Sequence, residues 1–207
     1  MRRHGVLGNI RVDGVINALG GDVILMSREV VNNGTISAPN GTVAMAGGTE
    51  VLLRETGSDR VYVRVGSAEG RVENNNLIDA ARVELESMGG NIYALAVNNT
   101  GVVRANGIQV NDGEIWLVGT GGRVSNSGTL QASNSGAGGV VNLEGDEITL
   151  AAGSSLDASG AGASVTLTAD LMDIKGSIDG SGGDVILQEM TAGTIIDLGS
   201  RVDLQPN

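Results

Sequence analysis

A short phrase recurs along almost the whole chain, and it constrains the fold more than any other feature of the sequence. Each copy places an aliphatic residue two positions before a small residue, as in the Gly-Thr-Ile-Ser-Ala run that ends at Ala38. Measured at the last residue of each copy, the steps between copies are 20, 42, 25, 27, 26 and 22 residues. Self-similarity at this spacing is typical of a solenoid. We interpret the step of 42 residues as two coils, one of which has lost its phrase.

Each coil is expected to consist of short β-strands joined at glycine-rich corners. Short segments alternate apolar and polar side chains and are separated by Gly and Asn, a pattern typical of strands and turns. No stretch shows the periodicity of an amphipathic helix. The sequence therefore predicts an all-β fold, a single-stranded parallel β-helix of roughly eight or nine coils with about 20–27 residues each.

The phrase predicts two columns of side chains inside the tube, because residues two apart on a strand share a face. The aliphatic column contains Ile16, Ile36, Ile78, Val103, Leu130, Leu156 and Ile178. The small column contains Ala18, Ala38, Ala80, Ala105, Ala132 and Ala158, with Gly180 in the last copy. The polar residues between the two columns are expected to face outward.

Composition and charge exclude several classes of protein. The chain has 207 residues and a formal net charge of −11, so it would repel a phosphate backbone, and we expect no nucleic-acid partner. It has no cysteine, which rules out disulfides and thiolate metal sites. No apolar run approaches the roughly 18 residues that span a bilayer, so we expect no transmembrane segment.

We expect a single β-helical domain over residues 1–207, because a repeat array has no internal boundary. We also expect the chain to be part of a longer rod. A charged excursion at residues 54–76 interrupts the repeat. It is either the coil without a phrase or a hairpin packed on the side of the rod, and a role in binding a partner is an alternative interpretation.

Asparagine is concentrated at the predicted corners, where strand backbone has no regular partner. We expect the side chains to form a ladder along the rod, each bonding to the next coil, as a structural rather than a binding device. The candidates are Asn32, Asn33, Asn98, Asn99 and Asn126.

The sequence offers no catalytic group and implies no cofactor. Asp157 and Asp179 fall in one outward column, where a bridging Ca²⁺ is conceivable because calcium prefers oxygen ligands. The glycine-rich nonapeptide of calcium-binding β-rolls is missing, however, so we favour a solvated acidic face. Trp116 alternates with Ile115 and Leu117, and we expect it to face outward.

Three stretches go beyond a generic β-helix pattern. Residues 30–48, 97–105 and 124–133 closely resemble the filamentous haemagglutinin-like exoproteins of bacterial two-partner secretion, in the later part of their secretion domain and early stalk. The resemblance implies a right-handed parallel β-helix that an outer-membrane barrel transporter exports to the cell surface or the medium. The Asn-Pro-Asn motifs of the far N-terminal part of such proteins are absent, since the only prolines are Pro39 and Pro206.

The leading hypothesis is a non-enzymatic secreted or cell-surface rod that acts as an adhesin stalk or adhesion module. Its ligand would lie on a host or neighbouring cell. The first alternative is a self-assembling extracellular filament or matrix subunit, because the open ends of a β-helix favour end-to-end self-association. The second is a polysaccharide-cleaving β-helix enzyme, which the scattered carboxylates and the 1% aromatic content disfavour.

Overall fold

The computed structural model describes residues 2–4, 8–48, 50–56, 60–65, 70–88, 95–106, 113–133 and 136–194, and for residues 2–4, 50–56 and 60–65 it describes the backbone only. Every regular element in these residues is a β-strand. Alternating Val, Ile and Leu with polar residues gives each strand one apolar face, and glycine or asparagine ends the strands at the corners.

The strands form three rows in which each strand pairs in parallel with its counterpart in the next coil. The first row contains β2 (Asn9–Val12), β5 (Glu29–Asn32), β9 (Arg71–Asn74), β11 (Leu95–Asn99), the end of β13 (Glu114–Asn126), the end of β15 (Val140–Leu150) and β18 (Leu171–Ile174). The second row contains β3 (Val15–Asn17), the start of β6 (Thr35–Gly47), the start of β10 (Leu77–Met88), β12 (Val102–Ala105), β14 (Thr129–Gln131), β16 (Ser155–Asp157) and β19 (Ser177–Asp179).

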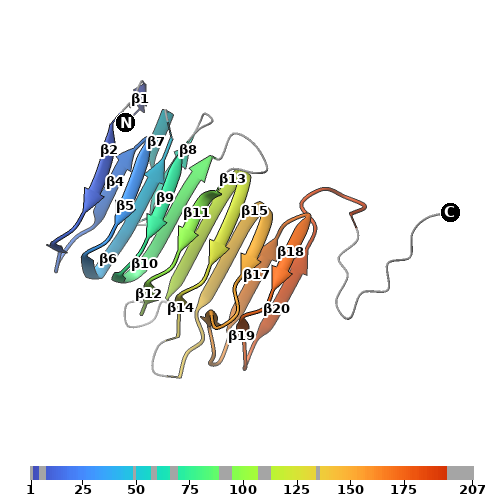
Figure 1. Ribbon diagram of the computed structural model, residues 1–207. Coiled ribbons are helices and arrows are strands. Elements are labelled where there is room, and N and C mark those ends of the chain that lie inside the picture. The colour runs from blue at the N-terminus through green and yellow to red at the C-terminus, as the bar shows by residue number, and fades with distance from the viewer. Residues whose placement is uncertain are drawn as a thin grey trace.

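The third row contains β4 (Val23–Ser27), the ends of β6 and β10, the starts of β13 and β15, β17 (Ser164–Thr168) and β20 (Asp184–Gln188). The chain passes through the three rows in turn and then rises to the next coil. Figure 1 shows the strands side by side along the rod, from the N-terminal coil in blue to the C-terminal coil in red. The molecule is a parallel β-helix.

The register places the residues of the repeated phrase in vertical columns. Ile36 pairs with Ile78, and Ile78 pairs with Val103 in the following coil. Leu130 and Leu156 continue the column. These five side chains are at most 1% exposed, whereas Ile16 and Ile178 in the first and last described coils are partly exposed. Each coil therefore buries its apolar face against its neighbours.

The expectation of a hidden coil within the 42-residue step is wrong. Ala38 pairs directly with Ala80, so the coil of β5 and β6 is followed at once by the coil of β9 and β10. The residues between them contain β7 (Glu50–Thr56) and β8 (Arg60–Val65), an antiparallel pair to which β1 (Arg2–His4) adds a third strand. The described strands form seven coils rather than the expected eight or nine. The parallel β-helix resumes at Arg71, five residues before the predicted end of the charged excursion at residue 76.

The glycine that opens several copies of the phrase has a steric cause. At the corner between the first and second rows, successive coils approach so closely that a side chain would meet backbone. A Cβ atom on Gly34 would lie 1.9 Å from the carbonyl oxygen of Gly14, and one on Gly128 would lie 1.9 Å from that of Gly101. The corner therefore accepts glycine because the coil-to-coil spacing leaves no room for a side chain.

We expect the aliphatic column to contribute unequally along the rod. Ile78→Ala removes a fully buried side chain with neighbours on both sides and should lower the free energy of unfolding by about 2–5 kcal/mol. Ile16→Ala makes the same chemical change at a partly exposed end and should cost less than half as much. Urea unfolding of both variants measures the difference, and equal losses would contradict the stacking described above.

Candidate functional surfaces

A ladder of four asparagines runs through the interior of the rod at the end of the first row. The side-chain amide of Asn32 donates to Oδ1 of Asn74 at 2.8 Å, Asn74 donates to Asn99 at 2.8 Å, and Asn99 donates to Asn126 at 2.7 Å. All four residues are completely buried. Such a chain of side-chain hydrogen bonds satisfies polar groups that water does not reach.

The same amides also hold the corner that follows them. Nδ2 of Asn99 donates to the carbonyl oxygen of Gly101, and Nδ2 of Asn126 donates to that of Gly128, each at 3.2 Å. Nδ2 of Asn74 donates likewise to the carbonyl of Asn76 at 2.9 Å. No buried side-chain nitrogen or oxygen in the described part of the chain lacks a hydrogen-bond partner. The ladder therefore supports the turn backbone between two rows.

The structure separates the five asparagines that the sequence groups together. Asn32, Asn99 and Asn126 lie in the buried ladder, with Asn74 as a fourth member that sequence analysis missed. Asn98 lies one position earlier on its strand, on the outer face, level with Glu73 and Ser125. The period-two pattern could have shown this, because adjacent residues on a strand face opposite sides.

Asn33 belongs to a second, exposed column just outside the buried ladder. Its amide donates to Oδ1 of Asp13 at 2.9 Å, and its own Oδ1 accepts from Nδ2 of Asn75 at 2.9 Å. Thr100 extends the column by donating to Asn75, also at 2.9 Å. The hydrogen bond from Asn33, with the nearby Arg11, lowers the pKa of Asp13 below its ordinary value of 3.8.

Asp157 and Asp179 lie one coil apart in the outward column of the second row. Each carboxylate is already engaged by a serine two residues further on. Oδ1 of Asp157 accepts from the backbone amide of Ser159 at 3.0 Å and from its hydroxyl, and Oδ1 of Asp179 accepts the same pair from Ser181. The described residues contain no group of three His, Cys, Asp or Glu side chains that could hold a metal ion. These contacts give the two carboxylates a role in turning the chain at the corner.

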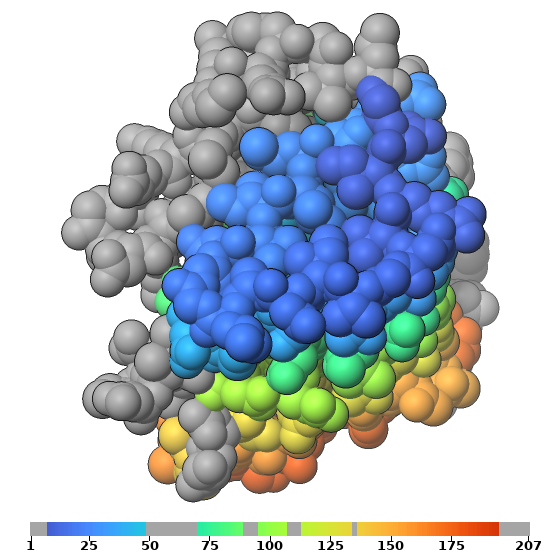
Figure 2. Space-filling model, turned by 90° about the vertical axis from the view of Figure 1, so that its left-hand side faces the viewer, coloured from blue at the N-terminus to red at the C-terminus, as the bar shows by residue number. Residues whose placement is uncertain are grey.

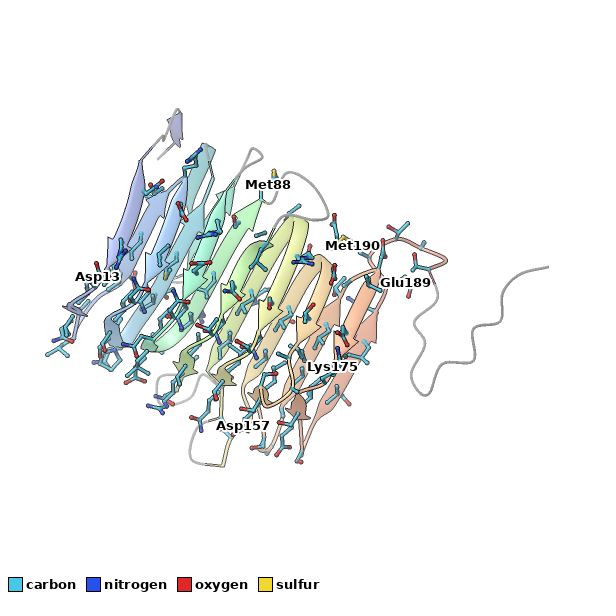
Figure 3. The ribbon with its side chains drawn as sticks, in the orientation of Figure 1. Asp13, Met88, Asp157, Lys175, Glu189 and Met190 are labelled. Atoms are coloured by element: carbon cyan, nitrogen blue, oxygen red, sulfur yellow. The ribbon has the colours of Figure 1, made fainter. Side chains whose placement is uncertain are left out.

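Part of the outer face of the third row forms a contiguous apolar cluster. Ala44 and Ala46 alternate with the interior residues Val43 and Met45, so they face outward, yet they are completely buried. Ile24, Met26 and Met88 pack with them as a small second core. Strand β8 lies against β6 and β10, which places the extra antiparallel sheet over this strip. Figure 3 labels Met88 at the end of β10 that is nearest to this sheet.

Further along the same face, the outward residues are a mixture of charged, polar and apolar side chains. Glu84 and Glu86 occupy the columns of Ala44 and Ala46 in the next coil. Trp116 follows in register between Glu84 and Asn142 and is partly exposed. The apolar strip therefore ends within the coil of β10, and the outward residues of the following coils in this column, Trp116, Asn142 and Thr166, are partly exposed.

The comparisons with known proteins bear on the fold. No protein-family model and no curated protein matches the chain. Among solved structures it is similar to the crystal structure of the HMW1 secretion domain from Haemophilus influenzae, with 19% sequence identity and a TM-score of 0.54. The two chains share a fold. The similarity covers 91% of this chain and 64% of that chain, so this chain spans less than two thirds of the secretion domain's length.

Within the residues that the structure describes, we find no helix whose length and apolar character would suit it to cross a lipid bilayer.

Breaking the buried ladder at its centre should destabilise the rod. Asn74→Ala leaves the amide of Asn32 and Oδ1 of Asn99 without their side-chain partner in a dry interior, and we expect a loss of about 1–3 kcal/mol. Asn98→Ala is the matched control, because it removes the same side chain from the outer face and should cost about 0.5 kcal/mol or less. Chemical denaturation compares the two variants, and a harmless Asn74→Ala would contradict the structural role of the ladder.

The apolar strip should not tolerate charge. Ala44→Glu would bury a carboxylate beneath the extra sheet and should lower the unfolding free energy by about 1–3 kcal/mol. Thr166→Glu introduces the same group two coils beyond Trp116 in the same column, where the side chain is partly exposed, and should be nearly neutral. Thermal unfolding measures both variants, and Ala44→Glu should melt at the lower temperature. An Ala44→Glu chain that melts at or above the temperature of Thr166→Glu would contradict the burial of this strip.

Three exposed carboxylates predict loss of stability in acid. Hydrogen bonds from Asn33 to Asp13, from Thr191 to Asp170 and from Ser181 to Asp179 lower the pKa of each acceptor below the ordinary 3.8. A lowered folded-state pKa stabilises the protein above pH 3.8, and this stability is lost as the pH falls through the folded-state value. Unfolding free energies at about pH 5 and pH 3 should therefore differ less in Asp13→Asn than in the native chain. Unchanged acid sensitivity of this variant would refute the assignment.

Proposed function

We propose that the chain is a non-enzymatic segment of a secreted or surface-exposed bacterial rod that is exported by two-partner secretion and serves as an adhesin stalk or adhesion module. The observation that carries the proposal is the unbroken parallel pairing of seven described coils in one column register. The structural similarity to a secretion domain supports it, as does the resemblance of the repeated phrases to filamentous haemagglutinin-like exoproteins.

The mechanism of such a rod is geometric. Each coil adds one inter-strand spacing of about 4.8 Å to the length, so the seven coils form a shaft on the order of 30 Å long. The buried columns join every described coil to the next, and the asparagine ladder joins four of these coils. A ligand-binding module on the same polypeptide would be held away from the cell by this shaft, in proportion to the number of coils.

We propose that residues 1–207 form one β-helical domain within a longer rod. The rows continue without interruption through the insertion that contains β7 and β8, because Glu29 pairs directly with Arg71 across it. The insertion is thus an outgrowth of one coil and does not divide the array. An outer-membrane barrel transporter is the partner that the proposed export route requires.

The first alternative is a filament or matrix subunit, which differs from a stalk in what its ends contact. The second is a polysaccharide-cleaving enzyme, and the described carboxylates give it little support. Asp157 and Asp179 are engaged by serines at their own corners. Incubation with uronic-acid polymers tests this alternative, since a lyase or hydrolase would release reducing ends.

The decisive test is the location and form of the protein on the producing cell. Antibodies against this chain, used for immunogold electron microscopy on intact cells, should label the cell surface or material in the medium. Protease added to intact cells should remove the surface label. Antigen that becomes accessible only after lysis would contradict export. Single tethered rods would favour the stalk, and continuous filaments would favour the subunit.

A further inference from the structure

The two ends of the described rod carry strands that pair on one side only. In the first described coil, β2, β3 and β4 pair with the second coil. In the last, β18, β19 and β20 pair with the sixth coil. Figure 2 looks onto the N-terminal end, where the first coil lies in front. Apolar residues are exposed at these ends, among them Val15 at 68% and Val185 at 48%. Unpaired edges beside exposed apolar side chains favour association with another β-structure.

The first and last described coils have the same internal spacing. Ile10 and Ile16 are six residues apart and Val23 follows seven residues later, and each belongs to an interior column of its row. Their counterparts in the last coil repeat both intervals. Those counterparts are Met172, Ile178 and Val185. The second coil, with Val30, Ile36 and Val43, repeats both intervals and stacks on the first coil in register. The end coils therefore match row for row, so all three strands of one could pair with all three of the other.

Charges on the outer face of the first row are arranged in opposite order at the two ends. In the first coil Arg11 precedes Asp13, with 2.7 Å between Nε and Oδ1. In the last coil Asp173 precedes Lys175, with 2.5 Å between the charged atoms. If the first coil of one copy stacks on the last coil of another with Ile10 over Met172, then Arg11 lies over Asp173 and Asp13 lies over Lys175. Figure 3 labels Asp13 and Lys175 at opposite ends of the rod.

One like-charged pair would also meet in this arrangement, between Asp22 and Asp184. Its repulsion is reduced because the Asp22 carboxylate points into its own chain. Oδ1 of Asp22 accepts from the backbone amide of Thr42 in the second coil at 2.8 Å. On the third row, Ile24 would lie over Ile186, which is 44% exposed in the single chain. Apolar and charge complementarity therefore favour the same register.

We propose that the C-terminal end of one copy of this chain binds the N-terminal end of a second copy, with β18 against β2, β19 against β3 and β20 against β4. The contact is head to tail, so it does not close on itself and extends into filaments. It continues the parallel pairing and the interior columns of the rod across the junction. A further coil of the same polypeptide would take the same strand edges, so this contact and the longer rod exclude each other. The proposal therefore deepens the first alternative function, the filament subunit, and it does not depend on the route of export.

A charge-swap cycle tests the contact. Lys175→Asp should place a second carboxylate against Asp13 of the neighbouring copy and raise the dissociation constant by about two- to fivefold. Asp13→Lys should do the same. The double variant restores opposite charges at the junction and should recover association, although both variants disrupt the ion pair within their own coil. Residues 13 and 175 are six coil steps apart in one chain, on the order of 29 Å, so such rescue must act between copies.

Sedimentation velocity over a series of concentrations measures the association, with the full chain throughout. Arg104→Asp is the matched control, because it makes the same change of charge on an outward residue in the middle of the rod and should not alter association. Val185→Lys, a change at the exposed apolar end, should abolish association while circular dichroism shows an unchanged fold.

Two results would overturn the proposal. A native chain that stays monomeric at every concentration would do so, including the case in which its own residues 195–207 occupy the C-terminal end. Association without rescue in the double variant would also do so, because it would mean that the ends meet in another arrangement, such as tail to tail.

Discussion

The parallel pairing of each coil with the next is the interaction on which the rest of the structure depends. A single coil of this chain is a loop of three short strands that cannot bury its own apolar side chains. Stacking in register places one aliphatic side chain over another in each row, and Ile36, Ile78 and Val103 show the result, since none of them is exposed to solvent. Stability is therefore a property of neighbouring coils, and it decreases toward an end where one neighbour is missing.

The buried polar side chains also depend on neighbouring coils for their partners. At the corner between the first and second rows, backbone amides of one coil donate to carbonyl oxygens of the coil before it, as Val102 does to Asn76. The buried asparagines add side-chain hydrogen bonds to the same carbonyls. Asn74 donates to the next asparagine and also to the carbonyl oxygen of Asn76. The ladder runs through four coils and stops where Val12 and Leu150 take the same position. An asparagine in this position needs another above or below it, which explains why the four occur consecutively.

The sequence was sufficient to predict the parallel β-helix, because the phrase repeats with a period that sets the coil and an alternation that sets the inside. It could not distinguish an insertion from a coil without a phrase. Both give a step of 42 residues, and only the pairing of Ala38 with Ala80 shows that nothing intervenes. The apolar strip was also missed. Ala44 and Ala46 are the outward residues of an alternating strand, and their burial depends on a sheet formed by distant residues.

At the candidate sites, too, the sequence predicts part of the arrangement and strand register decides the rest. Asn98 and Asn99 are adjacent and chemically identical. Because adjacent residues on a strand point to opposite faces, Asn98 lies at the surface and Asn99 in the buried ladder. Asn74 lies beside Asn75 and Asn76 at the edge of the charged segment, where the repeat was hardest to align. For Asp157, the serine two residues later determines its contacts. Local sequence thus indicates which residue types gather at a corner, and strand register determines what each one does.

Direct proximity of the second and third coils is the most specific consequence of this register, and a disulfide measures it. The chain has no cysteine, so Ser37→Cys combined with Asp79→Cys introduces a single pair, on outward positions that face each other across adjacent coils. Neighbouring strands lie about 4.8 Å apart, within the range of a disulfide, whereas one intervening coil would double that distance and prevent the bond. Mild oxidation should close the bond as completely as in Asn17→Cys with Ser37→Cys, a pair from the first two coils. A Ser37→Cys/Asp79→Cys chain that stays reduced while this reference pair oxidises would contradict the account.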